Sequence, residues 1–210
     1  MILRNQTKFE ALKHDKELTM RLFRVYILLI VIGILNSCGK ASFPKPYGYY
    51  RVDLPPHSYR LVDTLNLPYT FEIPKNAVLA SSESKDGKYW VDIIYPQLNA
   101  TIYCSYKSVN GNLTELLEDT RKIVYKHTIR ADVITERPFI QYDKKAYVIL
   151  YDLKGNTASS VQFVMTDSLK NFFRGALYFN NIPNKDSIAP MSEYVREDIM
   201  HIMESFQWKK

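Results

Sequence analysis

The sequence predicts an α+β fold in which two main helices pack on a mostly antiparallel β-sheet. Three observations support this. Two long segments repeat apolar residues with helical spacing, and most of the remainder alternates apolar and polar residues as short strands. The order along the chain is strands, helix, strands, helix, with no regular βαβ alternation and no internal repeat.

The first strands are expected between residues 69 and 107. The stretch "PYTFEIP" alternates and closes at Pro74. It is followed by "KYWVDIIYP" and "NATIYCSYK", two alternating runs that surround the turn-like "PQLN". We therefore expect a strand and then a hairpin.

The two helices follow from a change of period. Asn112 with Glu115 forms a start that resembles a capping box, and the helix is expected to run to about Arg130. Its apolar face comprises Leu113, Leu116, Leu117, Ile123 and Val124. The second helix is expected to start near Pro190, with an apolar face made by Val195, Ile199, Ile202, Met203 and Phe206.

Four more strands are expected between the helices: Ala131–Ile140, Lys145–Leu153, Thr157–Thr166 and Phe172–Phe179. "KGN" at 154–156 is the clearest hairpin turn among them. The element order is similar to that of the Mog1/PsbP-like α/β/α sandwich.

The N-terminal segment has the features of a signal peptide. Arg21 and Arg24 precede an apolar run from Val25 to Leu35. The run is shorter than the roughly 20 apolar residues that a membrane-spanning helix needs. Met20 is the expected true start, and residues 1–37 are set aside as leader and signal peptide.

The residues after this run resemble a bacterial lipobox. Leu35, Asn36 and Ser37 lead to Cys38, so the resemblance implies cleavage before Cys38 and acylation of its thiol. The alternative is a cysteine buried in a hydrophobic segment. Two or three acyl chains hold a protein on a membrane without spanning it. Gly39 occupies the position at which an inner-membrane retention signal has aspartate, and this favours the outer membrane. The stretch "GKASF" lacks the acidic cluster of a surface-export signal, so the domain is expected to face the periplasm.

Three regions are therefore expected along the chain. Residues 1–37 form the leader, residues 38–68 the lipidated cysteine with a Pro/Tyr-rich tether, and residues 69–210 a single globular domain. Prolines fix the backbone of the tether in extended form, and a few of its aromatic residues are expected to dock. A fully disordered linker is the alternative.

Charge and cysteine content exclude some classes of function. Lysine and arginine number 28 against 22 acidic residues, and half of the net charge of +6 lies in the leader, so no nucleic-acid partner is expected. Cys104 is the other cysteine besides Cys38, which predicts no intrachain disulfide and a buried structural thiol in a strand.

No motif for catalysis, metal or cofactor binding is recognisable. Outside the leader, His57, His127 and His201 lack metal-ligand spacing, and there is no Cys-x-x-Cys. The sequence contains no G-x-S-x-G, no P-loop and no G-x-G-x-x-G. The position of His127 favours an imidazolium at a helix C-terminus. We therefore expect a protein that is not an enzyme and has no metal and no cofactor.

The densest group of polar residues lies between 152 and 187. One interpretation is a recognition edge for a protein partner made by Gln162, Asp167 and Arg174. The other is structural: Asp167 and Ser168 cap a turn, and Arg174 pairs across it.

Several stretches carry a resemblance to a known family. "FPKPYGYYRVDLP" after the lipobox cysteine, "GNTASSVQFVMTDS", "FFRGALYFNNIPNKDSIAP" and "EDIMHIMESFQWK" resemble the gliding motility lipoprotein GldD family of Bacteroidetes, from Cys38 to the C-terminus. The resemblance implies a periplasmic lipoprotein required for gliding motility and associated with the type IX secretion system. It brings no catalytic motif with it.

In such a host, three positions resemble the D-[ST]-aliphatic acceptor for O-glycosylation. They are Thr64, Ser168 and Ser187, each of which follows an aspartate. Chance is the alternative explanation, because the motif is short. Asp63 and Asp186 lie in better candidate turns than Asp167.

The leading hypothesis is a non-enzymatic binding or assembly component whose partners are cell-envelope proteins of the gliding and type IX secretion machinery. The alternative is a periplasmic domain that binds or hydrolyses envelope glycan or lipid. That alternative predicts a deep pocket with convergent polar groups and a perturbed titratable residue. Purely structural support of the outer membrane is a third hypothesis.

Overall fold

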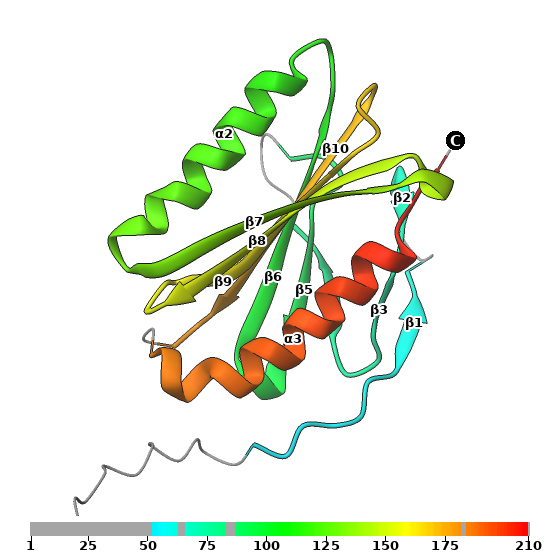
Figure 1. Ribbon diagram of the computed structural model, residues 1–210. Helices are drawn as coiled ribbons and strands as arrows, with labels where there is room; N and C mark the ends of the chain where they lie inside the picture. The colour runs from blue at the N-terminus through cyan, green and yellow to red at the C-terminus, as the bar shows by residue number, and fades with distance from the viewer. Residues whose placement is uncertain (1–51, 63–65, 83–86, 182–183, 210) are drawn as a thin grey trace, which may run out of the picture. The chain divides into compact units, whose positions relative to one another are not determined.

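The computed structural model describes residues 52–62, 66–82, 87–181 and 184–209, all of which belong to one compact unit, Tyr47–Lys210 (Figure 1). The expected signal peptide, the lipobox with Cys38, and Thr64 lie outside the described residues.

A seven-stranded sheet forms the centre of this unit, in the order β4-β5-β6-β10-β9-β8-β7. Every neighbouring pair is antiparallel, which confirms the expected sheet type. The strands are β4 (Val78–Ser81), β5 (Val91–Tyr95), β6 (Ala100–Ser108), β7 (Ala131–Gln141), β8 (Ala146–Gly155), β9 (Ser159–Thr166) and β10 (Asn171–Phe179).

Two of the hairpins use the same kind of connection. A 3₁₀ turn, η1 (Pro96–Leu98) or η3 (Tyr142–Lys144), is followed by one residue in the left-handed region, Asn99 with φ 49° or Lys145 with φ 50°. Asparagine tolerates this conformation better than most residues. The "PQLN" turn of the sequence is therefore confirmed as the β5–β6 connection.

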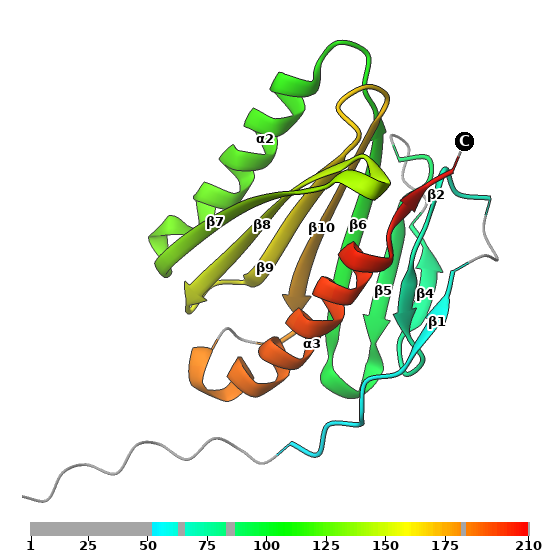
Figure 2. The same ribbon diagram turned by 45° about the vertical axis from the view of Figure 1, so that its right-hand side comes forward.

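Two helices cover opposite faces of the sheet, α2 (Leu113–Tyr125) on one side and α3 (Lys185–Ser205) on the other (Figure 2). The alternation of β9 and β10 separates their cores. Met165 and Phe173 point to the α3 side, whereas Val164 and Phe172 point to the α2 side. The α+β class with two helices on the sheet is thus confirmed.

The larger core lies on the α3 side and is rich in aromatic rings. Phe173 and Phe206 have ring centroids 5.1 Å apart, and Tyr69 lies 4.8 Å from Phe173. Two short ladders frame this core: β1 (Tyr59–Leu61) with β3 (Glu72–Pro74), and β2 (Tyr69–Thr70) with β11 (Gln207–Trp208). The expected apolar face of the last helix is fully buried here, comprising Val195, Ile199, Ile202, Met203 and Phe206.

Helix boundaries differ from the sequence expectation. Helix α3 begins at Lys185 because the Asn184 side chain accepts from the backbone N–H groups of Asp186 and Ser187, and Pro190 lies inside the helix. Helix α2 ends at Tyr125 and continues as the 3₁₀ turn η2 (Lys126–Ile129). Its Leu116 and Val124 are buried as expected, but Ile123 is exposed.

Strand boundaries also differ. Strand β8 continues to Gly155 and β9 starts at Ser159, so the turn lies later than 154–156. Strand β4 and the short strand β11 were not expected, because each has at most four residues and too little alternation to be recognised.

The docked part of the chain starts before Tyr69. Strand β1 pairs with β3, and Val62 is buried. A three-residue strand in a proline-rich segment is too short to show a periodicity that sequence analysis could recognise. The segment 52–62, which the sequence analysis assigns to the tether, therefore lies against the domain.

Candidate functional site

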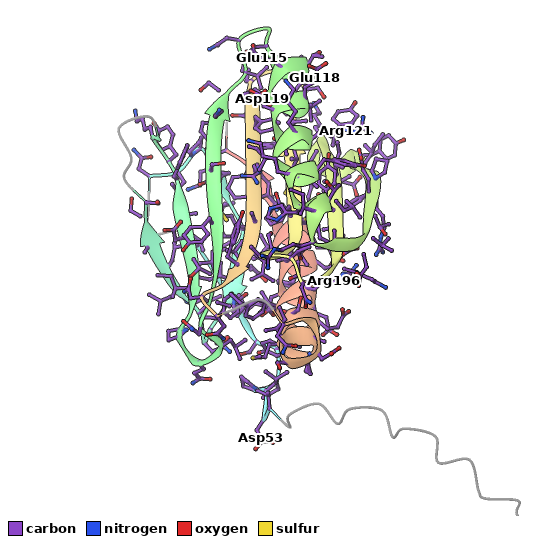
Figure 3. The ribbon with its side chains drawn as sticks, turned by 90° about the vertical axis from the view of Figure 1, so that its left-hand side faces the viewer. Asp53, Glu115, Glu118, Asp119, Arg121 and Arg196 are labelled. Atoms are coloured by element: carbon purple, nitrogen blue, oxygen red, sulfur yellow. The ribbon has the colours of Figure 1, made fainter. Side chains whose placement is uncertain are left out.

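Helix α2 covers only part of its side of the sheet. Its core contains residues of β8, β9 and β10, among them Tyr151, Val164 and Phe172. Figure 3 shows α2, with Glu115, Glu118, Asp119 and Arg121 labelled, and beside it strands that have no helix in front of them. We call the uncovered part around β6 and β10 the open face and define it by Tyr103, Ser105, Arg174 and Tyr178.

Arg174 is the central residue of the open face. Alternation along β10 sends Phe173 into the α3-side core and Arg174 to the other side. The guanidinium Nη2 of Arg174 donates to Gln162 Oε1 at 2.6 Å. Gln162 lies on the adjacent strand β9 and is completely buried. Both residues are candidates predicted from the sequence, and the structure brings them together.

Two N–H groups of this pair form no hydrogen bond within the described part of the chain. The Nε of Arg174 and the Nε2 of Gln162 are both buried, and neither has a hydrogen-bond partner among the described residues. Burial lowers the pKa of Arg174, against the smaller opposing influence of Tyr178 and Cys104. No described carboxylate acts on Arg174. A largely buried cation without a counter-charge is costly, so an acidic group from outside would be favoured here.

Two tyrosines accompany Arg174 on the open face. Tyr103, which is 44% exposed, and Tyr178 meet edge to face with ring centroids 5.7 Å apart. Tyrosine combines an apolar ring with a hydrogen-bonding hydroxyl, and arginine and tyrosine are enriched in binding surfaces. The arrangement suits contact with another protein.

Asp167 does not belong to this face. Its Oδ1 accepts from the backbone N–H groups of Leu169, Lys170 and Asn171 at 2.9, 2.8 and 2.8 Å. Partial burial raises the pKa of this carboxyl, but the hydrogen bonds outweigh it, so the pKa lies below its usual value. Asp167 thus organises the β9–β10 turn, in accordance with the structural interpretation of this residue.

The described candidate O-glycosylation positions differ in accessibility. Ser168 is exposed in the β9–β10 turn with φ 64°, and its N–H donates to Thr166 Oγ1 at 3.0 Å. Ser187 is half-buried in the first turn of α3.

Two other residues considered in the sequence analysis are structural. Cys104 is buried, and burial raises the pKa of its thiol far above the usual value. Burial, with a further effect from the charge of Arg174, lowers the pKa of His127. A lowered pKa disfavours the imidazolium, which opposes the helix C-terminal charge expected at His127.

A second polar cluster, which sequence analysis missed, fastens the segment 52–62 to α3. His57 Nδ1 lies 2.7 Å from Asp198 Oδ1, and His57 Nε2 lies 2.9 Å from Glu197 Oε2. The Tyr59 hydroxyl donates to Asp198 Oδ1 at 3.0 Å. Both ring nitrogens of His57 therefore face a carboxylate oxygen. Only the pairing of β1 with β3 brings these groups together, so no local sequence signal could reveal them.

Asp198 is completely buried at the centre of this cluster. Burial raises the pKa of its carboxyl, against the lowering effect of His57 and Tyr59. Beside it, His201 Nε2 lies 2.7 Å from Glu72 Oε2, and the His201 ring stacks on Tyr59 with centroids 3.5 Å apart. We call His57, Tyr59, Asp198 and His201 the N-terminal clasp.

The described part of the chain contains no group of three or more His, Cys, Asp or Glu residues placed to hold a metal ion. It also contains no helix whose length and hydropathy would allow it to cross a membrane.

Comparisons with known proteins were made at the level of families, curated proteins and solved structures. No curated protein matches the chain significantly. Among solved structures it is similar to cyanobacterial PsbP (CyanoP) from Synechocystis sp. PCC 6803, with 11% identity and a TM-score of 0.48, over 75% of this chain and 96% of that one. The family model described as gliding motility lipoprotein GldD matches residues 39–208. Because this match spans most of the chain, the protein belongs to the GldD family of gliding motility lipoproteins.

Proposed function

We propose that this lipoprotein is a non-enzymatic binding component of the gliding and type IX secretion machinery. Membership of the family supports a role in gliding motility and attachment to a membrane through lipid. The lipobox supports Cys38 as the lipidated residue. Gly39 after Cys38 supports the outer membrane, with the domain facing the periplasm.

The observation that carries the binding role is the uncompensated guanidinium of Arg174 on the open face. Its bond to the neutral amide of Gln162 holds it in place but leaves its charge unpaired. A partner carboxylate at the exposed part of the guanidinium would supply the missing counter-charge.

The partner that fits is an acidic segment of another cell-envelope protein. Arg174 would bind a carboxylate of this segment, while Tyr103 and Tyr178 would contact apolar atoms of the same segment. A lipid anchor confines both proteins to one membrane surface and raises their effective concentration, so a modest contact can suffice.

The test replaces Arg174 in a strain that lacks the chromosomal gene. Arg174→Met keeps an unbranched, flexible side chain and removes its charge, and Arg130→Met removes an exposed arginine elsewhere as a control. We expect Arg174→Met to abolish or strongly reduce colony spreading and the secretion of type IX cargo, and Arg130→Met to leave both unchanged.

The thermal unfolding of each purified variant separates binding from folding. Arg174→Lys, which retains a cation, should restore part of the activity. Normal spreading and secretion by Arg174→Met, at wild-type protein level, would refute the role of the open face.

The hydrolytic alternative finds less support. The hydroxyl groups of Ser160 and Ser192 are 2.7 Å apart, but among the described residues no histidine hydrogen-bonds to either of them as a base. The thiol of Cys104 is buried and its pKa is raised.

O-glycosylation at Thr64, Ser168 or Ser187 stays a separate proposal. Exposure favours Ser168 over Ser187. Mass spectrometry of the protein isolated from its host, before and after Ser168→Ala, would test it.

A further inference from the structure

A polar cavity of about 410 Å³ lies on the other side of the sheet from the open face, between β7, β8, β9 and helix α3. Arg196 of α3, labelled in Figure 3, lines this cavity. The cavity is lined by Thr135, Arg137, Asp152, Leu153, Lys154, Ser160, Val161, Ser192, Glu193 and Arg196.

Asp152 arranges two arginines in this cavity. Its Oδ1 accepts from Arg196 Nε at 2.8 Å, and its Oδ2 accepts from Arg196 Nη2 at 3.4 Å and from Arg137 Nη2. Asp152 is buried, and these donors satisfy both of its carboxylate oxygens. One carboxylate thus holds two guanidinium groups in place, and each retains unused N–H donors.

The remaining charges leave the cavity positive. Lys154 forms no ion pair with any described residue, and it adds a third cation. Glu193 is the second carboxylate, but its side chain is 67% exposed and lies 3.7 Å from Arg196 Nη1. Three cations therefore face two carboxylates, one of which stands at the solvent-exposed rim.

Hydroxyl groups supply the other polar contacts. Ser192 Oγ donates to Ser160 Oγ at 2.7 Å, and Thr135 adds a third hydroxyl to the lining. No aromatic ring lines the cavity. Its size falls in the range of small-molecule sites of roughly 300–1,000 Å³ and exceeds what a single oxyanion fills.

We propose that this cavity binds a small ligand that carries one oxyanion, a carboxylate or a phosphate, on a polyhydroxylated body such as an acidic sugar. The oxyanion is bound by Arg137, Arg196 and Lys154. The serine and threonine hydroxyls form hydrogen bonds with the hydroxyl groups of the ligand. The proposal goes beyond the protein-binding role, because it concerns the opposite face and a different kind of ligand.

The test uses three probes with the same sugar body and one without it. Glucuronate, glucose 6-phosphate, glucose and acetate are titrated into the isotope-labelled full chain, and binding is followed by NMR. Glucuronate or glucose 6-phosphate should shift the signals of the cavity residues, and the tighter of the two identifies the oxyanion. Glucose and acetate should bind at least about tenfold more weakly, since each lacks one half of the recognised chemistry.

Variants locate the binding. Arg137→Gln and Lys154→Gln should each weaken the tighter acidic sugar about five- to tenfold, since each removes a charge-assisted hydrogen bond. Lys107→Gln, a matched change on an exposed residue of β6, should have no effect, and neither should Arg174→Met. Raising the salt concentration should weaken binding.

Three results would overturn the proposal: neither acidic sugar shifts the cavity signals at millimolar concentration, glucose binds as well as glucuronate, or acetate binds as well as glucuronate. Because the readout is ligand binding by the purified protein, failure here leaves the motility test of Arg174 unaffected.

Discussion

At the scale of single residues, Gly175 shows how closely the sheet is packed. A Cβ at this position would lie 2.3 Å from two ring atoms of Phe163, which occupies the cross-strand position on β9. Phe163 is completely buried, so its ring has no free space to enter. Glycine is required here because an aromatic ring covers its backbone.

Gly175→Ala should therefore destabilise the domain by about 1–3 kcal/mol, the usual cost of overpacking a core. The measurement is urea unfolding. In a Phe163→Leu background the smaller side chain leaves room for the methyl group, so the same change should cost less. An equal cost in both backgrounds would show that the ring is not the cause.

Asp167 gives a residue-level prediction for pH. Its folded pKa lies below the usual value of about 3.9, so the group stabilises the fold above that pH and loses this effect as the pH falls through the folded pKa. Because the side chain is only partly buried and solvent screens its charge, we expect the effect to be at most about 1 kcal/mol.

Asp167→Asn should lower the free energy of unfolding at pH 7, and the difference from wild type should shrink below about pH 4. Urea unfolding at several pH values measures this. Asp143→Asn, at an exposed site in η3, serves as the control. A difference that stays constant down to pH 2 would contradict the charge-based explanation.

Whether a site residue can be predicted from the sequence depends on how many positions separate it from its interaction partner along the chain. Gln162 and Arg174 could be named because both lie in one hairpin, and Asp167 because it caps its own turn. His57 and Asp198 could not, since 141 positions separate them and only the folded chain joins them. Arg196 was missed for the same reason, since 44 positions separate it from Asp152.

At the scale of elements, the N-terminal clasp attaches segment 52–62 to helix α3. His57 stacks on Tyr194 with ring centroids 4.3 Å apart, in addition to its contacts with Asp198 and Glu197. The strands and helices with clear periodicity were predicted correctly in type. The short strands β1, β4 and β11 were not, because their pairing and not their composition defines them.

His57→Ala should release segment 52–62 and destabilise the domain by about 1–3 kcal/mol, because the buried Asp198 loses a hydrogen-bonding partner. Hydrogen exchange of residues 52–62 should accelerate, while the exchange of β8 and β9 changes less. His127→Ala, the same substitution in η2, should leave the segment protected. Unchanged exchange of residues 52–62 in His57→Ala would show that β1 pairing alone holds the segment.

At the scale of the whole molecule, the two proposed binding surfaces differ in chemistry and lie on opposite sides of one sheet. The open face presents Arg174 and tyrosines, and the cavity beneath α3 presents a positive, hydroxyl-rich interior. A membrane-attached protein with this arrangement can contact a protein on one side while a small ligand occupies the other.

Cys38→Ala should move the protein from the membrane fraction to the soluble fraction, because acylation of this thiol is the proposed anchor. Fractionation and immunoblotting measure the shift, and Cys104→Ala provides a matched control that should stay with the membrane. Unchanged fractionation of Cys38→Ala would refute the lipobox. If tethering is needed for function, the soluble form will not restore colony spreading to a deletion strain.

The pairing of β6 with β10 has a consequence for biogenesis. Helix α2 and three further strands separate these neighbours along the chain, so the hairpin β5–β6 keeps an unpaired edge until residues 171–179 are available. Long-range pairing of this kind is slow, and an open strand edge invites association with other chains. A nascent or partly exported chain therefore needs protection until its last third has emerged, and truncation before β10 is expected to yield aggregates.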